Sequence, residues 1–78
     1  MNNDEKAIVV TGGSGFIGSN VCELLVASGY NVFNIDRRKR DIPGVTQYPF
    51  EINTKQVKGV IELIKPEAVF NPPSICIL

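Results

Sequence analysis

The 78-residue chain has no histidine and no tryptophan, and only two cysteines. Histidine is the commonest general base and a frequent metal ligand, so its absence removes the simplest route to acid–base or metal chemistry. Cys22 and Cys76 lie too far apart for a C-x-x-C pair and form no disulfide framework. We therefore expect no metal site and two free thiols in a reducing compartment.

The chain also lacks a charge imbalance and a long apolar run. Eight basic residues balance eight acidic ones, so bulk electrostatics give no reason to expect nucleic acid or an acidic membrane as a partner. The opening MNNDEK carries acidic side chains where a signal peptide would be basic, and no apolar run approaches the length of a membrane span. These features predict a cytoplasmic protein that binds neither nucleic acid nor membrane.

Hydrophobic periodicity predicts strands alternating with helices. Four strands are expected at 7–11, 31–35, 45–52 and 68–70. Two helices are expected, from Phe16 to a stop at Gly29 and from a cap at Asn53 or Thr54 to about Lys65. Such alternation favours parallel β-α-β units in a doubly wound α/β sheet. A chain this short holds at most one domain.

Spaced glycines stand directly behind the first expected strand, in the stretch VVTGGSGFIGS. Gly12, Gly15 and Gly18 form a G-x-x-G-x-x-G pattern, and Gly13 adds an overlapping G-x-G-x-x-G. Asp36 ends the second expected strand, 18 positions beyond Gly18. A glycine turn between a strand and a helix, followed by this acid, is the fingerprint of a dinucleotide site. The expected fold is therefore a partial Rossmann fold.

Each residue type has a chemical role in such a site. Glycine permits the tight turn and a close approach of the backbone to pyrophosphate, and Gly18 permits close helix–strand packing. The N–H groups of Phe16 and Ile17, in the first helical turn, would face the negative charge. Asp36 would accept hydrogen bonds from the adenosine ribose hydroxyls, which favours NAD over NADP.

The basic run 37–40 complicates the choice of cofactor. Arg37 and Arg38 stand beside the ribose position, where guanidinium groups can hold the 2′-phosphate of NADP. A short basic run is also typical of a solvated surface. We expect NAD, keep NADP as the alternative, and count Arg37 among the candidate cofactor contacts.

Other classes of protein also use a glycine-rich turn after a strand. A P-loop requires lysine where Ser19 stands, which argues against that motif. S-adenosylmethionine-dependent methyltransferases and flavin proteins also combine a glycine turn with an acid after the second strand, so both stay open. A purely structural β-α turn is the remaining alternative.

The stretch TGGSGFIGS, with a following strand that ends in an acid, resembles the N-terminus of the extended short-chain dehydrogenase/reductases. The similarity is greatest to the NAD-dependent epimerases and dehydratases that act on nucleotide sugars. Their T-G-x-x-G-x-x-G pattern begins here at Thr11. The resemblance implies that Phe16 and Ile17 contact the pyrophosphate, and that Glu51 and Ile52 occupy the place of an acid–apolar pair that contacts adenine.

The resemblance covers roughly residues 6–70 and implies that the catalytic half is missing. The family pairs a catalytic tyrosine with a lysine four residues later, whereas Asn34 and Ile52 follow Tyr30 and Tyr48 at that distance. We therefore expect no catalytic residue and no substrate domain, so that a nucleotide-sugar substrate would bind only if the missing part were supplied.

Residues 71–78 depart from the family pattern, with Asn71 in place of a histidine. We interpret 71–78 as an atypical tail after the fourth strand, as in a truncated or frame-shifted gene or a cut fragment. Residues 1–78 are then the N-terminal part of a Rossmann NAD(P)-binding domain without turnover of its own. The alternative is a non-catalytic remnant or small nucleotide-binding module. A fourth strand without a neighbour would leave an open sheet edge, which favours self-association.

Overall fold

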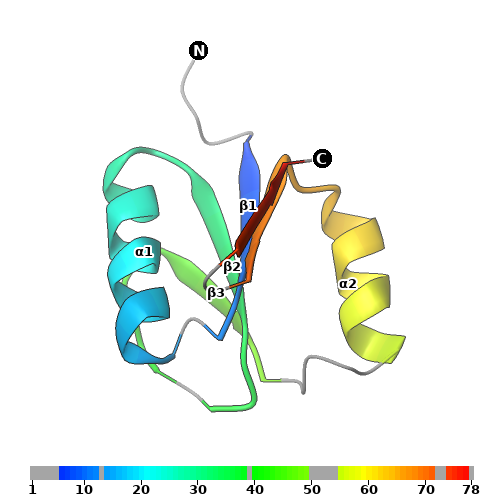
Figure 1. Ribbon diagram of the computed structural model, residues 1–78, viewed down its shortest axis with the longest axis horizontal. Coiled ribbons are helices and arrows are strands. Elements are labelled where there is room, and N and C mark those ends of the chain that lie inside the picture. The colour runs from blue at the N-terminus through cyan, green and yellow to red at the C-terminus, as the bar shows by residue number, and fades with distance from the viewer. Residues whose placement is uncertain (1–5, 13, 39, 50–54, 72–73, 78) are drawn as a thin grey trace.

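A single five-stranded sheet in the order β3-β2-β1-β4-β5 forms the centre of the molecule, with α1 on one face and α2 on the other (Figure 1). The computed structural model describes residues 6–12, 14–38, 40–49, 55–71 and 74–77. Along the chain the elements are β1 (Ala7–Thr11), α1 (Phe16–Ala27), β2 (Asn31–Ile35), β3 (Val45–Tyr48), α2 (Lys55–Ile64), β4 (Ala68–Asn71) and β5 (Ser74–Ile77).

Four of the strands are parallel, as predicted. β1 pairs with β2 on one side and with β4 on the other, and β2 pairs with β3. β3 is shorter than the expected strand 45–52 and ends just before Pro49, which has no N–H to donate to a neighbouring strand. The expected caps Asn53 and Thr54 lie outside the described residues. The doubly wound parallel sheet is confirmed.

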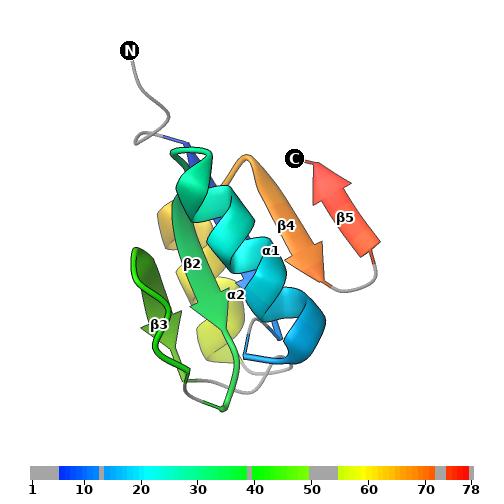
Figure 2. The ribbon, with the colours of Figure 1, turned by 90° about the vertical axis from the view of Figure 1, so that its left-hand side faces the viewer.

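The end of the chain adds a strand that the sequence did not predict. β5 pairs antiparallel with β4, with Asn71 opposite Ser74 and Ala68 opposite Ile77 (Figure 2). The expectation that β4 would leave an open sheet edge is therefore wrong. An antiparallel partner needs only a short connection, whereas a further parallel strand would need a long crossover. β3 and β5 are the outer strands of the described sheet.

Two apolar cores lie on opposite faces of β1. Ile8 and Val10 pack with Cys22 of α1, and Val9 packs with Val57 of α2 and Ile35 of β2. β1 is apolar at consecutive positions because both of its faces are covered. Among the described residues, no helix is long and apolar enough to cross a lipid bilayer.

The two tyrosines pack against these cores. Tyr30 contacts the α1-side core, and Tyr48 contacts the α2-side core. The ring of Tyr48 also stacks on Phe33, with 6.1 Å between ring centroids.

Candidate functional site

The turn between β1 and α1 is fixed at its two described glycines. Gly12 has a φ of 69°, in the left-handed region that favours glycine. Its N–H donates to the carbonyl of Ile35 at 3.0 Å, so the turn begins tied to the end of β2. The N–H of Gly15 then donates to the carbonyl of Gly12 at 3.2 Å. Gly13 lies outside the described residues.

The N-terminus of α1 is open to a ligand. Gly15 is the N-cap in an extended conformation, no side chain caps the helix, and the first turn carries no acidic residue. The first N–H groups of a helix have no partner within the helix, so those of Phe16 and Ile17 remain able to donate. Both side chains are exposed, 81% for Phe16 and 61% for Ile17. Gly18 is buried in α1.

The carboxylate of Asp36 is held at the carboxyl end of β2 by neighbouring donors. Its Oδ2 accepts from the backbone N–H of Ser14 at 3.1 Å, which joins it to the glycine turn. Its Oδ1 accepts from the backbone N–H of Arg38 at 2.9 Å. The Arg38 side chain adds Nε at 3.4 Å from Oδ1 and Nη2 at 3.3 Å from Oδ2. Asp36 is only 6% exposed, yet all of these contacts favour its ionised form.

These donors determine the protonation state of Asp36. Burial by itself would raise the pKa of the carboxyl group, but the backbone N–H and side chain of Arg38 and the backbone N–H of Ser14 outweigh it. The pKa of Asp36 is consequently lowered from its ordinary value. The site therefore presents a carboxylate, which accepts hydrogen bonds, at neutral pH.

A buried polar network beneath this carboxylate was not predicted from the sequence. Asn34 is fully buried, and its Nδ2 donates to Gln47 Oε1 at 2.8 Å and to Ser14 Oγ at 3.3 Å. Ser14 Oγ donates in turn to the carbonyl of Arg38 at 2.6 Å. The network links β2, β3 and the glycine turn. An asparagine inside the apolar strand NVFNI was the one sequence signal for it.

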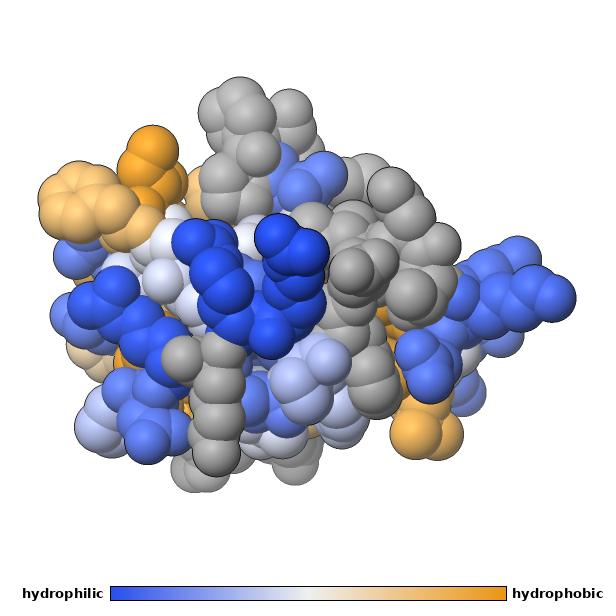
Figure 3. Space-filling view, turned by 90° about the horizontal axis from the view of Figure 1, so that it is seen from below, coloured by the Kyte–Doolittle hydropathy of each residue, from blue (hydrophilic) through white to orange (hydrophobic). Residues whose placement is uncertain are grey.

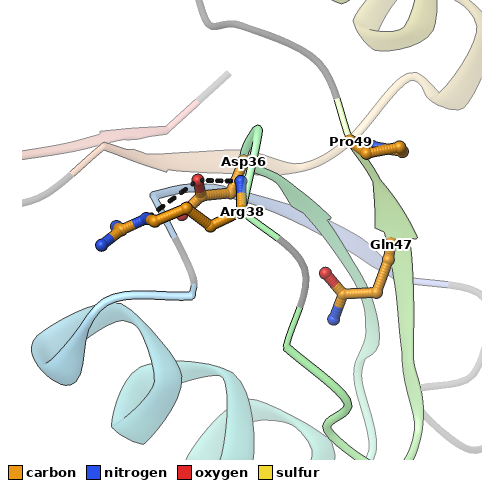
Figure 4. A pocket seen from close by; sticks show the side chains of 4 residues that line it. All are labelled: Asp36, Arg38, Gln47 and Pro49. Atoms are coloured by element: carbon orange, nitrogen blue, oxygen red, sulfur yellow. Dashed lines mark hydrogen bonds and ion pairs between the residues drawn. The ribbon is translucent and has the colours of Figure 1, made fainter.

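A small pocket opens beside Asp36. It is lined by Asp36, Arg38, Gln47 and Pro49 and has a volume of about 230 Å³ (Figure 4). Its size suits one moiety of a ligand rather than a whole dinucleotide. Figure 3 views the carboxyl edge of the parallel strands, where hydrophilic side chains gather in the middle.

The structure brings together some of the residues that the sequence predicts as cofactor contacts. The described members at the carboxyl edge of the sheet are Gly12, Gly15, Phe16, Ile17 and Asp36. Arg37 is exposed next to Asp36, and the guanidinium of Arg38 contacts the carboxylate. Glu51 and Ile52, the predicted adenine contacts, lie outside the described residues.

Thr11 and Asn71 form a second polar pair at the same edge, on the other side of β1. Thr11 Oγ1 donates to Asn71 Oδ1 at 2.6 Å, across 60 positions of sequence. Thr11 is buried and Asn71 is exposed. In the sequence, Asn71 is distinguished only by its departure from the family pattern.

A glycine turn after the first strand, an uncapped helix N-terminus and a carboxylate after the second strand define a Rossmann-type nucleotide-binding unit. A profile of the NAD dependent epimerase/dehydratase family matches residues 8–73. The chain belongs to this family.

Solved structures agree with this assignment. UDP-glucose 4-epimerase from Thermotoga maritima, solved with UDP-glucose, is 31% identical over 87% of this chain and 24% of that protein, with a TM-score of 0.75. The Thermus thermophilus UDP-glucose 4-epimerase, in complex with NAD, gives the same identity, coverage and TM-score. A dTDP-glucose 4,6-dehydratase from Bacillus anthracis, in complex with NAD, is 28% identical over 88% of this chain and 27% of that protein, with a TM-score of 0.73. The chain thus spans about a quarter of the length of these relatives.

Proposed function

We propose that this chain binds NAD as the N-terminal cofactor-binding portion of a sugar-nucleotide epimerase/dehydratase-like protein, and that it has no turnover by itself. The observation that carries the proposal is the contact between the Ser14 N–H and Asp36 Oδ2, at 3.1 Å. This contact holds the Asp36 carboxylate beside the glycine turn, which supports a role for it as the acceptor of the ribose hydroxyls. NAD-bound relatives support the same choice of cofactor.

The parts of NAD have distinct partners in this proposal. Asp36 accepts from the adenosine ribose hydroxyls, and the N–H groups of Phe16 and Ile17 donate to the pyrophosphate. Glu51 and Ile52 contact adenine, and Arg37 lines the outer side of the ribose. The nicotinamide ring of NAD supplies hydride transfer when the cofactor is bound to a complete enzyme. Binding, and not chemistry, is what the residues of this chain perform.

The lack of turnover follows from the residues available. Proton transfer in this family needs a tyrosine–lysine pair, and neither Tyr30 nor Tyr48 has the lysine four residues later. Both tyrosines pack against apolar cores. A nucleotide sugar would bind only where the rest of the family fold is supplied. A cytoplasmic location and an absence of nucleic-acid partners remain part of this proposal.

Titration of the purified chain tests the binding proposal. We expect amide chemical shifts of Gly12, Gly15 and Asp36 to move with NAD, a weaker response to NADP, and none to S-adenosylmethionine. Asp36→Ala should weaken NAD binding about tenfold or more, because the ribose hydroxyls lose a charged acceptor. Asp41→Ala, at an exposed position, is the matched control and should leave the Kd unchanged.

Two results would overturn the proposal. Tighter binding of S-adenosylmethionine than of NAD would assign the glycine turn to a methyltransferase fragment. NADH formation or sugar epimerisation by the chain alone would contradict the absence of turnover.

A further inference from the structure

The Thr11–Asn71 pair lies at the point where the sheet reverses its direction of winding. From β1 the chain passes through α1 to β2 on one side, and after β3 it returns through α2 to β4 on the other side of β1. The two helices lie on opposite faces of the sheet (Figure 1). In open α/β sheets, ligands bind outside the carboxyl ends of the strands at this switch point. Thr11 ends β1 and Asn71 ends β4, so both stand at that position.

The hydrogen bond between them fixes which end of the Asn71 amide faces outward. Oδ1 of Asn71 accepts from the buried Thr11 hydroxyl, and this uses the oxygen on the protein side. Nδ2 has no hydrogen-bond partner among the described residues, and the Asn71 side chain is exposed. The pair therefore offers an exposed N–H₂ donor at the carboxyl end of β4, beside the end of β1.

The strand order determines which part of a ligand this donor meets. Asp36 ends β2 on one side of β1, and Asn71 ends β4 on the other. Neighbouring strands are about 4.8 Å apart, so roughly 10 Å of sheet edge separates the two strand ends. Consider a dinucleotide whose adenosine ribose is hydrogen-bonded to Asp36. Its adenosine lies on the β2 side of β1, so only the groups that follow the adenosine come near the turn after β1 and near Asn71. The first of these groups is the pyrophosphate, at the N-terminus of α1.

We infer that Asn71 is a pyrophosphate-binding residue of this chain, with Nδ2 donating to a phosphate oxygen, and that Thr11 is its positioning residue. The inference rests on the proposed NAD binding and adds a contact from β4 to it. The N–H groups at the start of α1 and the Asn71 amide then hold the phosphates from two sides.

Asn71→Asp tests the contact sharply. Aspartate keeps the oxygen that accepts from Thr11 and replaces only the outward N–H₂ with an anionic oxygen, which repels phosphate. We expect its Kd for ADP and for NAD to rise about tenfold or more, with the Kd for adenosine unchanged, in NMR titrations of the 78-residue chain. Asn31→Asp adds the same charge at the opposite, amino end of β2 and should change the Kd for ADP less than twofold.

A neutral variant separates the hydrogen bond from the charge. Asn71→Ala should weaken ADP binding about fivefold, again with adenosine binding unchanged. Thr11→Val should produce part of the same loss, and Thr11→Ser, which keeps the hydroxyl, should restore the wild-type Kd. The amide spectrum of each variant shows whether the fold is retained, and Asn71→Asp supplies the answer if either the alanine or the valine variant is unfolded.

The results distinguish this inference from the proposed function. If wild type binds adenosine and NAD, and Asp36→Ala weakens both, the proposed function holds whatever Asn71 does. Within that outcome, equal Kd values for ADP in Asn71→Asp and Asn31→Asp would overturn the assignment of Asn71. A parallel loss of adenosine binding in Asn71→Asp would overturn it too, because the adenosine lies on the other side of β1. Failure of wild type to bind any of these ligands would overturn both.

Discussion

The guanidinium of Arg38 lies across the carboxylate of Asp36, with Nη2 3.3 Å from Oδ2 and Nε 3.4 Å from Oδ1. The same Nη2 would lie 3.4 Å from a Cβ added to Gly15, so the Arg38 side chain spans the gap between the Asp36 carboxylate and the glycine turn. The Arg38 side chain is 64% exposed and its ionic contacts are long, so it is able to move aside. The backbone donors of Ser14 and Arg38 would still hold Asp36 in place.

Removing the Arg38 side chain is expected to sharpen the preference for NAD. Arg38→Ala leaves Asp36 fully negative toward a 2′-phosphate and removes a cation that could pair with it, so NADP should bind about tenfold more weakly. NAD should bind at least as tightly as before, since its ribose no longer competes with the guanidinium. Parallel calorimetric titrations with NAD and NADP measure the ratio of the two Kd values.

Two nearby arginines serve as controls for that experiment. Arg40→Ala removes a charge at an exposed position and should leave the ratio unchanged. Arg37→Ala tests the arginine that the sequence predicts as a cofactor contact. A larger change in the ratio for Arg37→Ala than for Arg38→Ala would show that the Arg38–Asp36 pair has no part in choosing the cofactor.

Ionised Asp36 is expected to stabilise the fold, with a defined dependence on pH. Its pKa is lowered in the folded chain, so the stabilisation is fully present above the unfolded-state pKa, about 3.9, and is lost as the pH falls through the lower folded-state pKa. The difference in unfolding free energy between wild type and Asp36→Asn should therefore be constant from about pH 7 to about pH 5 and should shrink below about pH 4.

Urea unfolding at several pH values measures this difference. Asp41→Asn, at an exposed position, should cost less than about 0.5 kcal/mol and serves as the control. The prediction would be contradicted if the difference in unfolding free energy between wild type and Asp36→Asn increased as the pH was lowered.

Two glycines should respond to alanine in opposite directions. Gly44 has a φ of 85°, and a Cβ there would lie 2.7 Å from Cγ1 of Val26. Gly44→Ala should therefore destabilise the fold by about 1–3 kcal/mol. Gly59 lies in α2 with nothing within 4 Å of an added Cβ, so Gly59→Ala should stabilise it by about 0.5–1 kcal/mol. Thermal or urea unfolding of the two variants measures the sign of each change in stability. A loss of stability in Gly59→Ala would contradict the placement of Gly59 at an open position of α2.

The thiol of Cys22 is expected to be inert while the chain is folded. It is completely buried in α1, and burial, with the nearby charge of Glu23, raises its pKa to about 11. In a Cys76→Ser background, an aromatic disulfide reagent should react with Cys22 only after unfolding, since the thiolate is the reactive form. The reaction rate measured against urea concentration would then follow the unfolding curve. Fast labelling in native buffer would show that the core between α1 and the sheet opens readily.

Much of the framework follows from local sequence. The expected strands at 7–11 and 31–35 coincide with β1 and β2, because a buried parallel strand is apolar at consecutive positions. The start of α1 at Phe16 follows from the glycines before it, and the end of α2 at Ile64 from Pro66 beyond it. Asp36 was identifiable as a candidate site residue by its distance from the turn.

By itself, then, the sequence determined the parallel α/β framework and the glycine–acid fingerprint, because backbone preferences and hydrophobic periodicity act over a few neighbouring residues. Tertiary structure alone decided that the Arg38 guanidinium contacts Asp36, that β5 pairs with β4, and that Thr11 meets Asn71. The direction of a loop side chain and a contact across 60 positions depend on the assembled sheet. Thr11 and Asn71 lie far apart in the sequence and meet only in the assembled sheet, whereas the other two contacts join neighbouring segments whose relative directions no local pattern encodes.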